Sequence, residues 1–563
     1  MSNIVNYKKI SNICDLFNYQ LIKNPDQKFL FSMKENKWEG KTYKELSENI
    51  SKVIYFLKKK EVKSGDRILL ISDNRIEWFI FDMAIMSLGA ITVPCFSTNN
   101  VTDNKFIIED CKPKLIVIEN IEIYEKNENF LKKIKNRLLI IEGANKKKLD
   151  SYYEIITDQN RKYSINKYIK KKDISSIIYT SGTSGKPKGV MLSHSSIIHN
   201  CYAALKLLSN FNICNEKFLS FLPLSHSYER MAGLYFPLSI GAQIYYCEGL
   251  EKINKNFIEV KPTFVTAVPR LYENIYKKIK FKIENSGPIV KYFFHKSIKL
   301  FKESKLRELT FYEKIINLFL FFIIKRKIQN IFGGNLKTFV SGGAALNPAV
   351  GDFFLSMGVN ILQGYGQTES SPLISCNDFE TNDTTTVGKP VVDVDVKISW
   401  EGEILVKGPN VMLGYWNDKT LTKKTIKNNW LHTGDLGSID ILDRLKIVGR
   451  KKDLIVTSGG DNISPTKIEN ILTSYSKVSQ AVIYGDNRPY LIAIIVCEQN
   501  VRQDQIKEII NLVNKSLNIP EKIRKFILLD ELFSYKNGLL TQTLKIKRTN
   551  VIKRYYKEID SLY

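Results

Sequence analysis

Residues 178–189 read Ile178-Tyr-Thr-Ser-Gly-Thr-Ser-Gly-Lys-Pro-Lys-Gly189. An apolar run typical of a buried strand precedes this stretch, and a helix is predicted to begin at Ser195 after it. Loops of this composition surround phosphate groups with backbone N–H, hydroxyl and ammonium groups. We therefore expect a phosphate-binding loop between a strand and a helix, which favours an α/β fold. Its candidate ligands are Thr180, Ser181, Gly182, Thr183, Ser184, Gly185, Lys186 and Lys188.

This loop differs from the Walker A motif, in which Gly-Lys comes five residues after the first glycine and is followed by Ser or Thr. Here Gly-Lys follows Gly182 too closely, and Pro187 stands where Ser or Thr is needed. A simple polar turn is disfavoured as well, because hydroxyl groups, glycines and lysines are concentrated in one short stretch. The loop therefore indicates a phosphate site of another class.

Helical and strand-like patterns alternate on both sides of the loop. Residues 43–60 and 78–88 are predicted helices, and residues 67–72 and 90–94 are predicted strands. The alternation resumes near residue 174. Such alternation predicts parallel sheets with helices on their faces.

The pattern changes to short strands and turns over residues 386–448, which predicts a small antiparallel or barrel-like unit. A polar break follows at residues 449–453, and the chain beyond it has its own mixed α/β pattern. A chain of 563 residues is too long for one core. We therefore expect an N-terminal domain over 1–449 and a C-terminal domain over 450–563.

The net charge of +26 suits an anionic ligand or surface. Lys, Ile and Asn are abundant throughout, so a coding bias toward Lys on solvated faces is the favoured explanation. The alternative is that the positive electrostatic potential attracts ATP, a phosphorylated thiol carrier or an anionic membrane. No nucleic-acid recognition motif is found, so nucleic acid is not expected as a partner.

The most apolar run, residues 315–324, is far shorter than the ~20 residues that a membrane-spanning helix needs. A buried helix is slightly favoured for this run. Lys325, Arg326 and Lys327 follow it directly, so a helix lying on a membrane surface is the alternative. The protein is expected to be cytoplasmic, and peripheral attachment to the cytoplasmic face of a membrane is left open.

The eight cysteines form no Cys-x-x-Cys pair, and most lie in apolar surroundings. Reduced, buried thiols are the simplest account, and they point to a reducing compartment. The first residues contain no apolar segment typical of a signal peptide. A zinc site is not expected.

The stretch 178–189 resembles the phosphate-binding loop of the adenylate-forming superfamily, which includes acyl-CoA synthetases, peptide-synthetase adenylation domains and luciferases. The resemblance extends over about residues 15–555, with the motifs in the family's order. It implies a large N-terminal domain of two mixed α/β sheet subdomains and a small β-barrel-like unit. It also implies a small, mobile α+β C-terminal domain.

Two further segments resemble the family's nucleotide site. In Ser341-Gly-Gly-Ala-Ala-Leu346, the resemblance places Gly343 and Ala344 along the adenine. In Gln363-Gly-Tyr-Gly-Gln-Thr-Glu369, Tyr365 would offer an aromatic face to adenine and Thr368 a hydroxyl to the α-phosphate. Glu369 would hold Mg²⁺, which usually takes one or two carboxylates together with substrate phosphates.

The second half of the chain supplies the remaining nucleotide groups by resemblance. Asp435 would accept hydrogen bonds from the ribose hydroxyls, and Arg450 would contact ribose or phosphates. Lys452 stands at the interdomain hinge. In the segment 538–548, Lys545 matches the catalytic lysine of the family.

Three segments resemble the long-chain branch of the acyl-CoA synthetases: residues 222–230, 267–273 and 538–548. The first contains a His-x-x-Glu-Arg pattern, which implies that His226 lies near the substrate carboxylate or the entry path of the thiol. Glu229 and Arg230 are interpreted as structural charges that could form an internal ion pair.

The resemblance implies an AMP-forming ligase that uses ATP, Mg²⁺ and CoA to convert a long- or medium-chain fatty acid into its thioester. Transfer to an acyl carrier protein is the first alternative, since both acceptors present the same thiol. Asp461 would repel an anionic phosphate of CoA, which leaves this choice open. A non-catalytic acyl or nucleotide binder is the alternative from another class.

Overall fold

The computed structural model describes residues 3–143, 149–157, 164, 168–181, 186–209, 211–498, 501–534, 536–541 and 545–563, without the side chains of residues 181, 250, 322 and 323. Gly182, Thr183, Ser184 and Gly185 of the predicted phosphate loop lie outside the described residues, and so does the side chain of Ser181.

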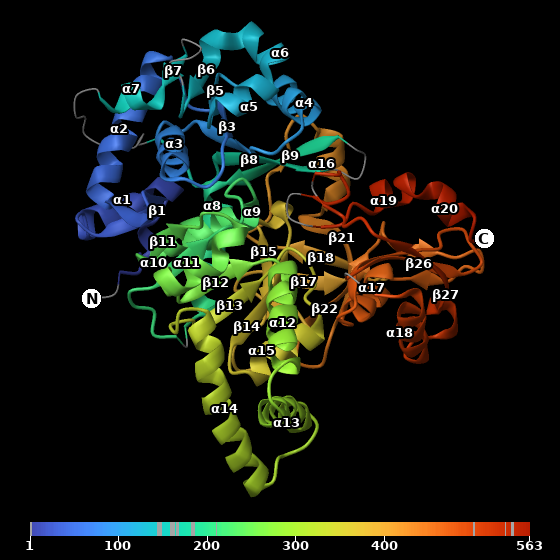
Figure 1. Ribbon diagram of the computed structural model, residues 1–563. Coiled ribbons are helices and arrows are strands. Elements are labelled where there is room, and N and C mark those ends of the chain that lie inside the picture. The colour runs from blue at the N-terminus through green and yellow to red at the C-terminus, as the bar shows by residue number, and fades with distance from the viewer. Residues whose placement is uncertain are drawn as a thin grey trace.

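The first large sheet, at the top of Figure 1, contains eight strands. Its order is β19 (Gly414–Tyr415), β9 (Pro187–Ser193), β8 (Ile174–Ser181), β4 (Ile91–Cys95), β3 (Arg67–Ile71), β5 (Leu115–Ile118), β6 (Leu138–Ile140) and β7 (Asp150–Ser151). The strands from β8 to β7 are parallel, whereas β9 and β19 pair antiparallel. All of β4 is buried, as expected for a parallel strand covered on both faces.

The second large sheet contains nine strands and lies below the first. Its order is β16 (Lys389–Pro390), β15 (Leu373–Cys376), β14 (Asn360–Gly366), β13 (Thr338–Ser341), β12 (Phe264–Ala267), β10 (Lys217–Ser220), β11 (Gln243–Tyr246), β1 (Lys28–Lys34) and β2 (Lys37–Thr42). The expected pair of mixed α/β sheets is therefore confirmed.

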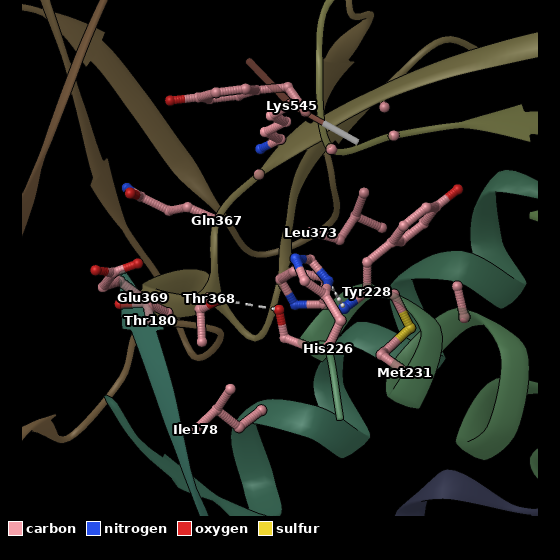
Figure 2. A pocket seen from close by; sticks show the side chains of 18 of the residues that line it. Ile178, Thr180, His226, Tyr228, Met231, Gln367, Thr368, Glu369, Leu373 and Lys545 are labelled. Atoms are coloured by element: carbon pink, nitrogen blue, oxygen red, sulfur yellow. Dashed lines mark hydrogen bonds between the residues drawn. The ribbon is translucent and has the colours of Figure 1, made fainter. Parts of the chain in front are cut away.

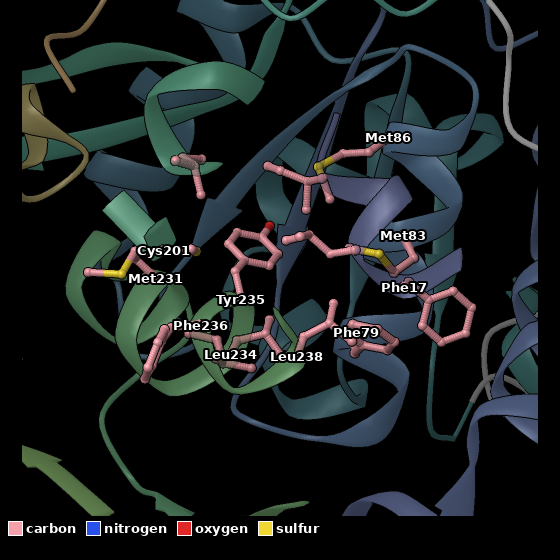
Figure 3. Packing of buried hydrophobic residues seen from close by; sticks show 14 of the residues in the cluster. Phe17, Phe79, Met83, Met86, Cys201, Met231, Leu234, Tyr235, Phe236 and Leu238 are labelled. Atoms are coloured by element: carbon pink, nitrogen blue, oxygen red, sulfur yellow. The ribbon is translucent and has the colours of Figure 1, made fainter. Parts of the chain in front are cut away.

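Helix α3 (Ile76–Ser87) lies between the two large sheets and contacts strands of both. Ten of its twelve residues are buried, which is typical of a helix covered on all sides. Figure 3 shows Phe79, Met83 and Met86 packing against Phe17 of α1 (Ile13–Lys23) and against the segment around Tyr235. One continuous core therefore joins the two sheets.

The remaining helices of the N-terminal part cover these sheets or connect their strands. They are α2 (Tyr43–Lys59), α4 (Val101–Cys111), α5 (Ile121–Lys126), α6 (Glu128–Leu131), α7 (Tyr152–Ile156), α8 (His194–Leu207), α9 (Ser227–Glu229), the π-helix η4 (Arg230–Tyr235), α10 (Phe236–Ile240), α11 (Ile253–Val260), α12 (Pro269–Glu284), α13 (Pro288–Ser304), α14 (Phe311–Ile331), α15 (Pro348–Ser356) and α16 (Lys419–Thr425).

The predicted barrel-like unit is an antiparallel sheet that does not close. Its strands are β17 (Asp395–Ile398), β18 (Glu403–Lys407), β21 (Trp430–Ile439), β20 (Ile426–Lys427) and β22 (Leu445–Arg450). β21 pairs with β18, β20 and β22, whereas no pairing joins β17 to β22 among the described residues. The barrel part of the prediction is therefore wrong, because β17 and β22 remain as edges.

The C-terminal part packs on the right in Figure 1. Its core is the three-stranded sheet β25 (Val478–Tyr484), β26 (Leu491–Cys497) and β27 (Ile523–Leu529). Around it lie β23 (Ile455–Val456), β24 (Asn462–Ile463), α17 (Pro465–Thr473), α18 (Gln503–Lys515), α19 (Arg548–Arg554) and α20 (Tyr556–Asp560). The expected α+β character is confirmed.

Helices α13 and α14 form a hairpin that projects from the lower end of the molecule in Figure 1. Leu320 and Ile328 of α14 are buried, but Ile315, Leu318 and Phe319 are exposed. The favoured prediction of a buried helix over 315–324 is therefore wrong for one face of the helix, because only the opposite face has α13 and α11 to pack against. Within the described residues, no helix combines the length and apolarity needed to cross a bilayer.

A fully buried ionic group links α3 to the π-helix η4. Asp82 of α3 forms an ion pair with Arg230 at the start of η4. Tyr235 donates a hydrogen bond from its hydroxyl to Asp82 Oδ2 at 2.6 Å and accepts one from Arg230 Nε at 2.8 Å. The guanidinium also lies over the ring of Trp78. Each charge is thus compensated within the apolar core, as buried ions require.

Replacing Asp82 by Ala is expected to lower the free energy of unfolding by about 3–5 kcal/mol, because Arg230 would remain buried without its counter-ion. Urea denaturation measures this loss. Glu39→Ala is the control: Glu39 pairs with Lys34 at 3.9 Å on the surface, and its removal should cost less than about 1 kcal/mol. Equal losses of unfolding free energy in the two variants would contradict the assignment of Asp82 as the buried counter-ion of Arg230.

Candidate functional site

A cavity of about 770 Å³ opens where the two large sheets, the small sheet and the C-terminal part meet. Figure 2 shows Thr180 of β8, Leu373 of β15 and Lys545 of the C-terminal part at this cavity, together with His226 and Glu369. The predicted site residues that line it are Thr180, Lys188, His226, Gly343, Tyr365, Thr368, Glu369, Arg450, Lys452 and Lys545.

Of the predicted site residues whose side chains the structure describes, three do not line the cavity. Lys186 and Ala344 are exposed, although Ala344 directly follows the lining residue Gly343. Asp435 is buried behind two lining residues, Tyr365 and Arg450. Their predicted roles remain predictions.

The hairpin of β8 and β9 brings the ends of the predicted phosphate loop to the cavity. Thr180 and Lys188 are direct cross-strand partners, so their side chains lie on the same face of the sheet. The ammonium group of Lys188 lies 5.7 Å from the ring centroid of Tyr415. This pairing places the hydroxyl of Thr180 and the ammonium group of Lys188 next to each other at the cavity.

Asp435 is held by two of the other predicted nucleotide ligands. It is the cross-strand partner of Arg450 in β21 and β22, and Arg450 Nε lies 3.0 Å from Asp435 Oδ1. Tyr365 donates its hydroxyl to Asp435 Oδ2 at 2.7 Å. Burial raises the pKa of Asp435, while Arg450 opposes this shift. The tyrosine ring is thereby fixed at the cavity wall.

Glu369 lies in a single turn of 3₁₀-helix, η6 (Thr368–Ser370). Tyr415 donates its hydroxyl to Glu369 Oε1 at 2.8 Å. Figure 2 shows Thr368 and Thr180 beside Glu369 at the cavity. One carboxylate with nearby hydroxyls is a hard oxygen donor set, and it fits Mg²⁺ that binds mainly through substrate phosphates.

The side chains of Thr368 and His226 are oriented by the segment of α9. The hydroxyl oxygens of Ser227 and Thr368 lie 3.1 Å apart within hydrogen-bonding distance. His226 Nδ1 accepts the backbone N–H of Tyr228 at 3.1 Å. Burial, together with the charge of Lys545, lowers the pKa of His226 to about 4. His226 is therefore neutral near pH 7, with its proton on Nε2 as a donor.

Lys545 lines the cavity, and its backbone makes two hydrogen bonds with Thr541. Thr541 N–H donates to Lys545 O at 2.7 Å, and Lys545 N–H donates to Thr541 Oγ1 at 3.0 Å. Burial and the neighbouring Arg450 lower the pKa of Lys545 to about 8, while Asp435 opposes the shift. The cavity therefore contains an ammonium group whose charge depends on its neighbours.

One side of the cavity is apolar. Its walls come from the end of α8, from η4 and α10, and from strands β10, β12, β14 and β15. The apolar lining residues there are Ala204, Leu207, Leu208, Phe218, Met231, Ala232, Phe236, Phe264, Leu362 and Leu373. The ring of Phe211, which does not line the cavity, packs against Phe264 with the ring centroids 6.0 Å apart. The cavity thus joins a charged end to an apolar end.

Sequence reasoning missed three residues that belong to this arrangement. Tyr415 holds Glu369, and Ser227 contacts Thr368. Gln367 lines the cavity, and its Nε2 is buried with no hydrogen-bond acceptor among the described residues. Gln367 lies within the motif 363–369, so the sequence could have indicated it as the one polar residue near Thr368 and Glu369 to which no role was assigned. Tyr415 carried no signal, because it is 46 residues from its partner.

Glu229 and Arg230 do not pair with each other, contrary to the expected internal ion pair. Thr266 donates its hydroxyl to Glu229 Oε2 at 2.9 Å, whereas Arg230 pairs with Asp82. Burial raises the pKa of Glu229 to about 7. Adjacent residues at this helical turn point to different parts of the core, which explains the separate partners.

The sequence profile of the AMP-binding enzyme family matches residues 17–416, and that of the AMP-binding enzyme C-terminal domain matches residues 452–563. The chain belongs to the AMP-binding enzyme family. The predicted resemblance to the adenylate-forming superfamily is therefore confirmed, and ATP is the nucleotide of this family.

The AMP-binding enzyme chain is 28% identical to the long-chain-fatty-acid–CoA ligase FadD15 of Mycobacterium bovis, over 96% of this chain and 95% of that protein. It is 30% identical to the chloroplastic long-chain-fatty-acid–[acyl-carrier-protein] ligase AEE15 of Arabidopsis thaliana, over 93% of this chain and 82% of that protein. The structure of ATP-bound MatB from Rhodopseudomonas palustris superposes with a TM-score of 0.76 at 20% identity, over 97% and 99% of the two chains. This last likeness concerns the fold.

The opposing effects on Lys545 give a direct test of the site's electrostatics. Arg450→Met should raise the pKa of Lys545, because Arg450 lowers it. Asp435→Asn should lower the pKa further, because Asp435 raises it. The pH dependence of trace acetylation at Lys545, followed by mass spectrometry, reports this pKa. Shifts of the same sign in the two variants would contradict the described arrangement.

Proposed function

We propose that this AMP-binding enzyme activates a long- or medium-chain fatty acid as its acyl-adenylate and transfers the acyl group to CoA. The observation that carries the proposal is a single cavity with a charged end and an apolar end, and with Lys545 and His226 in its wall. The names of the similar ligases support a fatty acid as the substrate.

The charged end suits ATP. Tyr365 would lie along the adenine, with Gly343 on the opposite side, and Asp435 would accept from the ribose beside Arg450. Thr180, Lys188 and the predicted loop between them would contact the phosphates. Glu369 would hold Mg²⁺, which neutralises phosphate charge when bound. Gln367 Nε2, a buried donor without an acceptor among the described residues, is suited to a phosphate or carbonyl oxygen.

The apolar end suits an acyl chain. Each methylene group removed from water contributes about 0.8 kcal/mol, so a fatty acid gains affinity as it fills the space between α8 and the second sheet. This orientation directs the carboxylate toward His226. The neutral imidazole with its proton on Nε2 can donate to the carboxylate without needing a charge.

In the first step, a carboxylate oxygen attacks the α-phosphorus of ATP, and pyrophosphate leaves. The ammonium of Lys545 and the hydroxyl of Thr368 stabilise the negative charge that develops on the phosphate oxygens. The walls of the cavity hold the two anionic reactants in position, which supplies much of the remaining acceleration.

In the second step, a thiol attacks the carbonyl carbon of the adenylate, AMP leaves and the thiol proton is released. The C-terminal domain, beginning at residue 450, would rotate about Lys452 between the steps and withdraw Lys545. The acceptor is CoA; the carrier-protein name of one relative keeps an acyl carrier protein as the second candidate. A non-catalytic binder is disfavoured, because Lys545, Glu369 and Asp435 are all chemically competent.

Separate half-reactions test the role of Lys545. Lys545→Ala is expected to lower fatty-acid-dependent pyrophosphate exchange by about 10²–10³-fold, because it removes one stabilising cation from the transition state. The same variant should still convert supplied acyl-adenylate and CoA to the thioester. Lys553→Ala, at an exposed lysine of α19 that does not line the cavity, is the matched control and should retain both activities. Equal loss of both half-reactions in Lys545→Ala would refute the domain rotation.

Filling the apolar end tests the substrate class. Ala204→Phe should lower the kcat/KM for palmitate more than tenfold and leave hexanoate nearly unchanged, because roughly two displaced methylene groups cost about 1.6 kcal/mol. Ala349→Phe, at an exposed alanine of α15, is the control. Pyrophosphate exchange across a panel of acids provides the measurement. If neither the wild type nor the Ala204→Phe variant showed a dependence of kcat/KM on chain length, the assignment of the acyl site would be contradicted.

A further inference from the structure

The α13–α14 hairpin exposes an apolar tip. The hairpin tip consists of Leu306, Phe311, Tyr312, Ile315, Leu318 and Phe319. Its outermost residues, Leu306, Phe311 and Tyr312, are 87%, 81% and 73% exposed. In Figure 1 the N-terminal end of α14 lies farther from the body of the molecule than the rest of the helix. So many large apolar side chains at one projecting end are unusual for a surface that meets only water.

The spacing of these residues places them on one helical face. Phe311, Ile315, Leu318 and Phe319 recur at intervals of three and four residues, which gives an apolar stripe on α14. The opposite face of the helix is already occupied: Leu320 is buried with residues of α13 and its following loop. The exposed stripe is therefore a second apolar face, beyond what the packing of α14 requires.

The tip has a defined conformation. Thr310 and Glu313 form a reciprocal cap at the start of α14. Arg307 binds Glu313 Oε1 at 2.8 Å and Glu303 Oε2 at 2.9 Å, which ties the connecting loop to both helices. Arg307 thus pairs with two of the hairpin's acidic side chains, and the tip presents its apolar residues from a fixed scaffold.

The surroundings of the tip are strongly basic. Residues 277–331 contain fourteen Lys and Arg residues against four Glu residues, so this segment carries +10 of the chain's net +26. Lys302, Lys314 and Arg326 have no ion-pair partner in the described part of the chain, and each is exposed. By helical spacing, Arg326 continues the stripe of Ile315 and Phe319 toward the C-terminal half of α14.

We propose that the hairpin tip binds the surface of an anionic lipid bilayer. Its apolar side chains would enter the boundary between headgroups and acyl chains, while Lys302, Lys314 and Arg326 would pair with anionic headgroups. An apolar stripe flanked by cations is the pattern of a helix that binds at a membrane interface. The excess of cations favours a lipid surface over a second copy of this equally basic hairpin, because two such tips would repel each other.

Vesicle flotation of the full-length protein tests the apolar contribution. The probes are vesicles of phosphatidylcholine with 30% phosphatidylglycerol, and vesicles of phosphatidylcholine alone. The triple variant Phe311→Ser, Ile315→Ser, Phe319→Ser should bind the anionic vesicles at least tenfold more weakly than the wild type. The matched control is Trp400→Ser, Ile441→Ser, Leu442→Ser, three exposed apolar residues elsewhere, which should change binding by less than twofold.

The electrostatic contribution has its own variant. Lys302→Gln, Lys314→Gln, Arg326→Gln should weaken binding to anionic vesicles roughly fivefold per cation removed and leave binding to neutral vesicles unchanged. Thermal unfolding of each variant checks that its fold is intact. The flotation assay contains no substrate, so its result does not depend on whether the proposed enzymatic activity is correct. Unchanged vesicle binding by the tip variant would overturn the proposal. So would a wild-type dimer, detected by light scattering, that the tip variant dissociates.

Discussion

The buried contact of Asp82 with Arg230 and Tyr235 is the constraint on which the rest of the N-terminal part depends. It joins α3, which packs between the two large sheets, to the π-helix that follows α9. The same short segment carries His226 and Ser227 on one side and the apolar wall residue Met231 on the other. A buried charge is stable only with its counter-ion in place, so this contact also fixes the wall between the polar and apolar ends of the cavity.

The small sheet and the C-terminal part position the charged residues of the cavity. The register of β21 and β22 sets Asp435 opposite Arg450, and this pair orients Tyr365. The positive charge of Arg450 lowers the pKa of Lys545, whereas the negative charge of Asp435 raises it. Groups far apart in sequence therefore share one electrostatic environment. The proposed domain rotation would move Lys545 and change this environment without altering the acyl wall, and one cavity would then serve both proposed steps.

Much of the architecture followed from local patterns. Alternating helices and strands predicted parallel strands covered by helices, since periodicity reflects which face of an element is buried. The two mixed sheets were implied by the resemblance to the adenylate-forming superfamily. The motifs around Thr368, Asp435 and Lys545 indicated an adenylating site through their resemblance to the adenylate-forming superfamily. Of the two alternatives for residues 386–448, the antiparallel sheet was confirmed and the barrel-like unit was wrong, because short strands with turns do not specify whether edge strands meet. The buried helix was wrong for one face, because apolarity alone does not determine how many neighbours a helix has.

By itself, the sequence determined the family, the alternation of helices and strands, and most of the predicted site residues that line the cavity. Only the tertiary structure decided how these residues act on one another: that Tyr415 holds Glu369, that Asp82 rather than Glu229 neutralises Arg230, and that Arg450 and Asp435 oppose each other at Lys545. It also decided that α14 keeps an apolar face toward the outside. The physical reason is that pairing, burial and pKa depend on distances between segments remote in sequence, which no local pattern encodes.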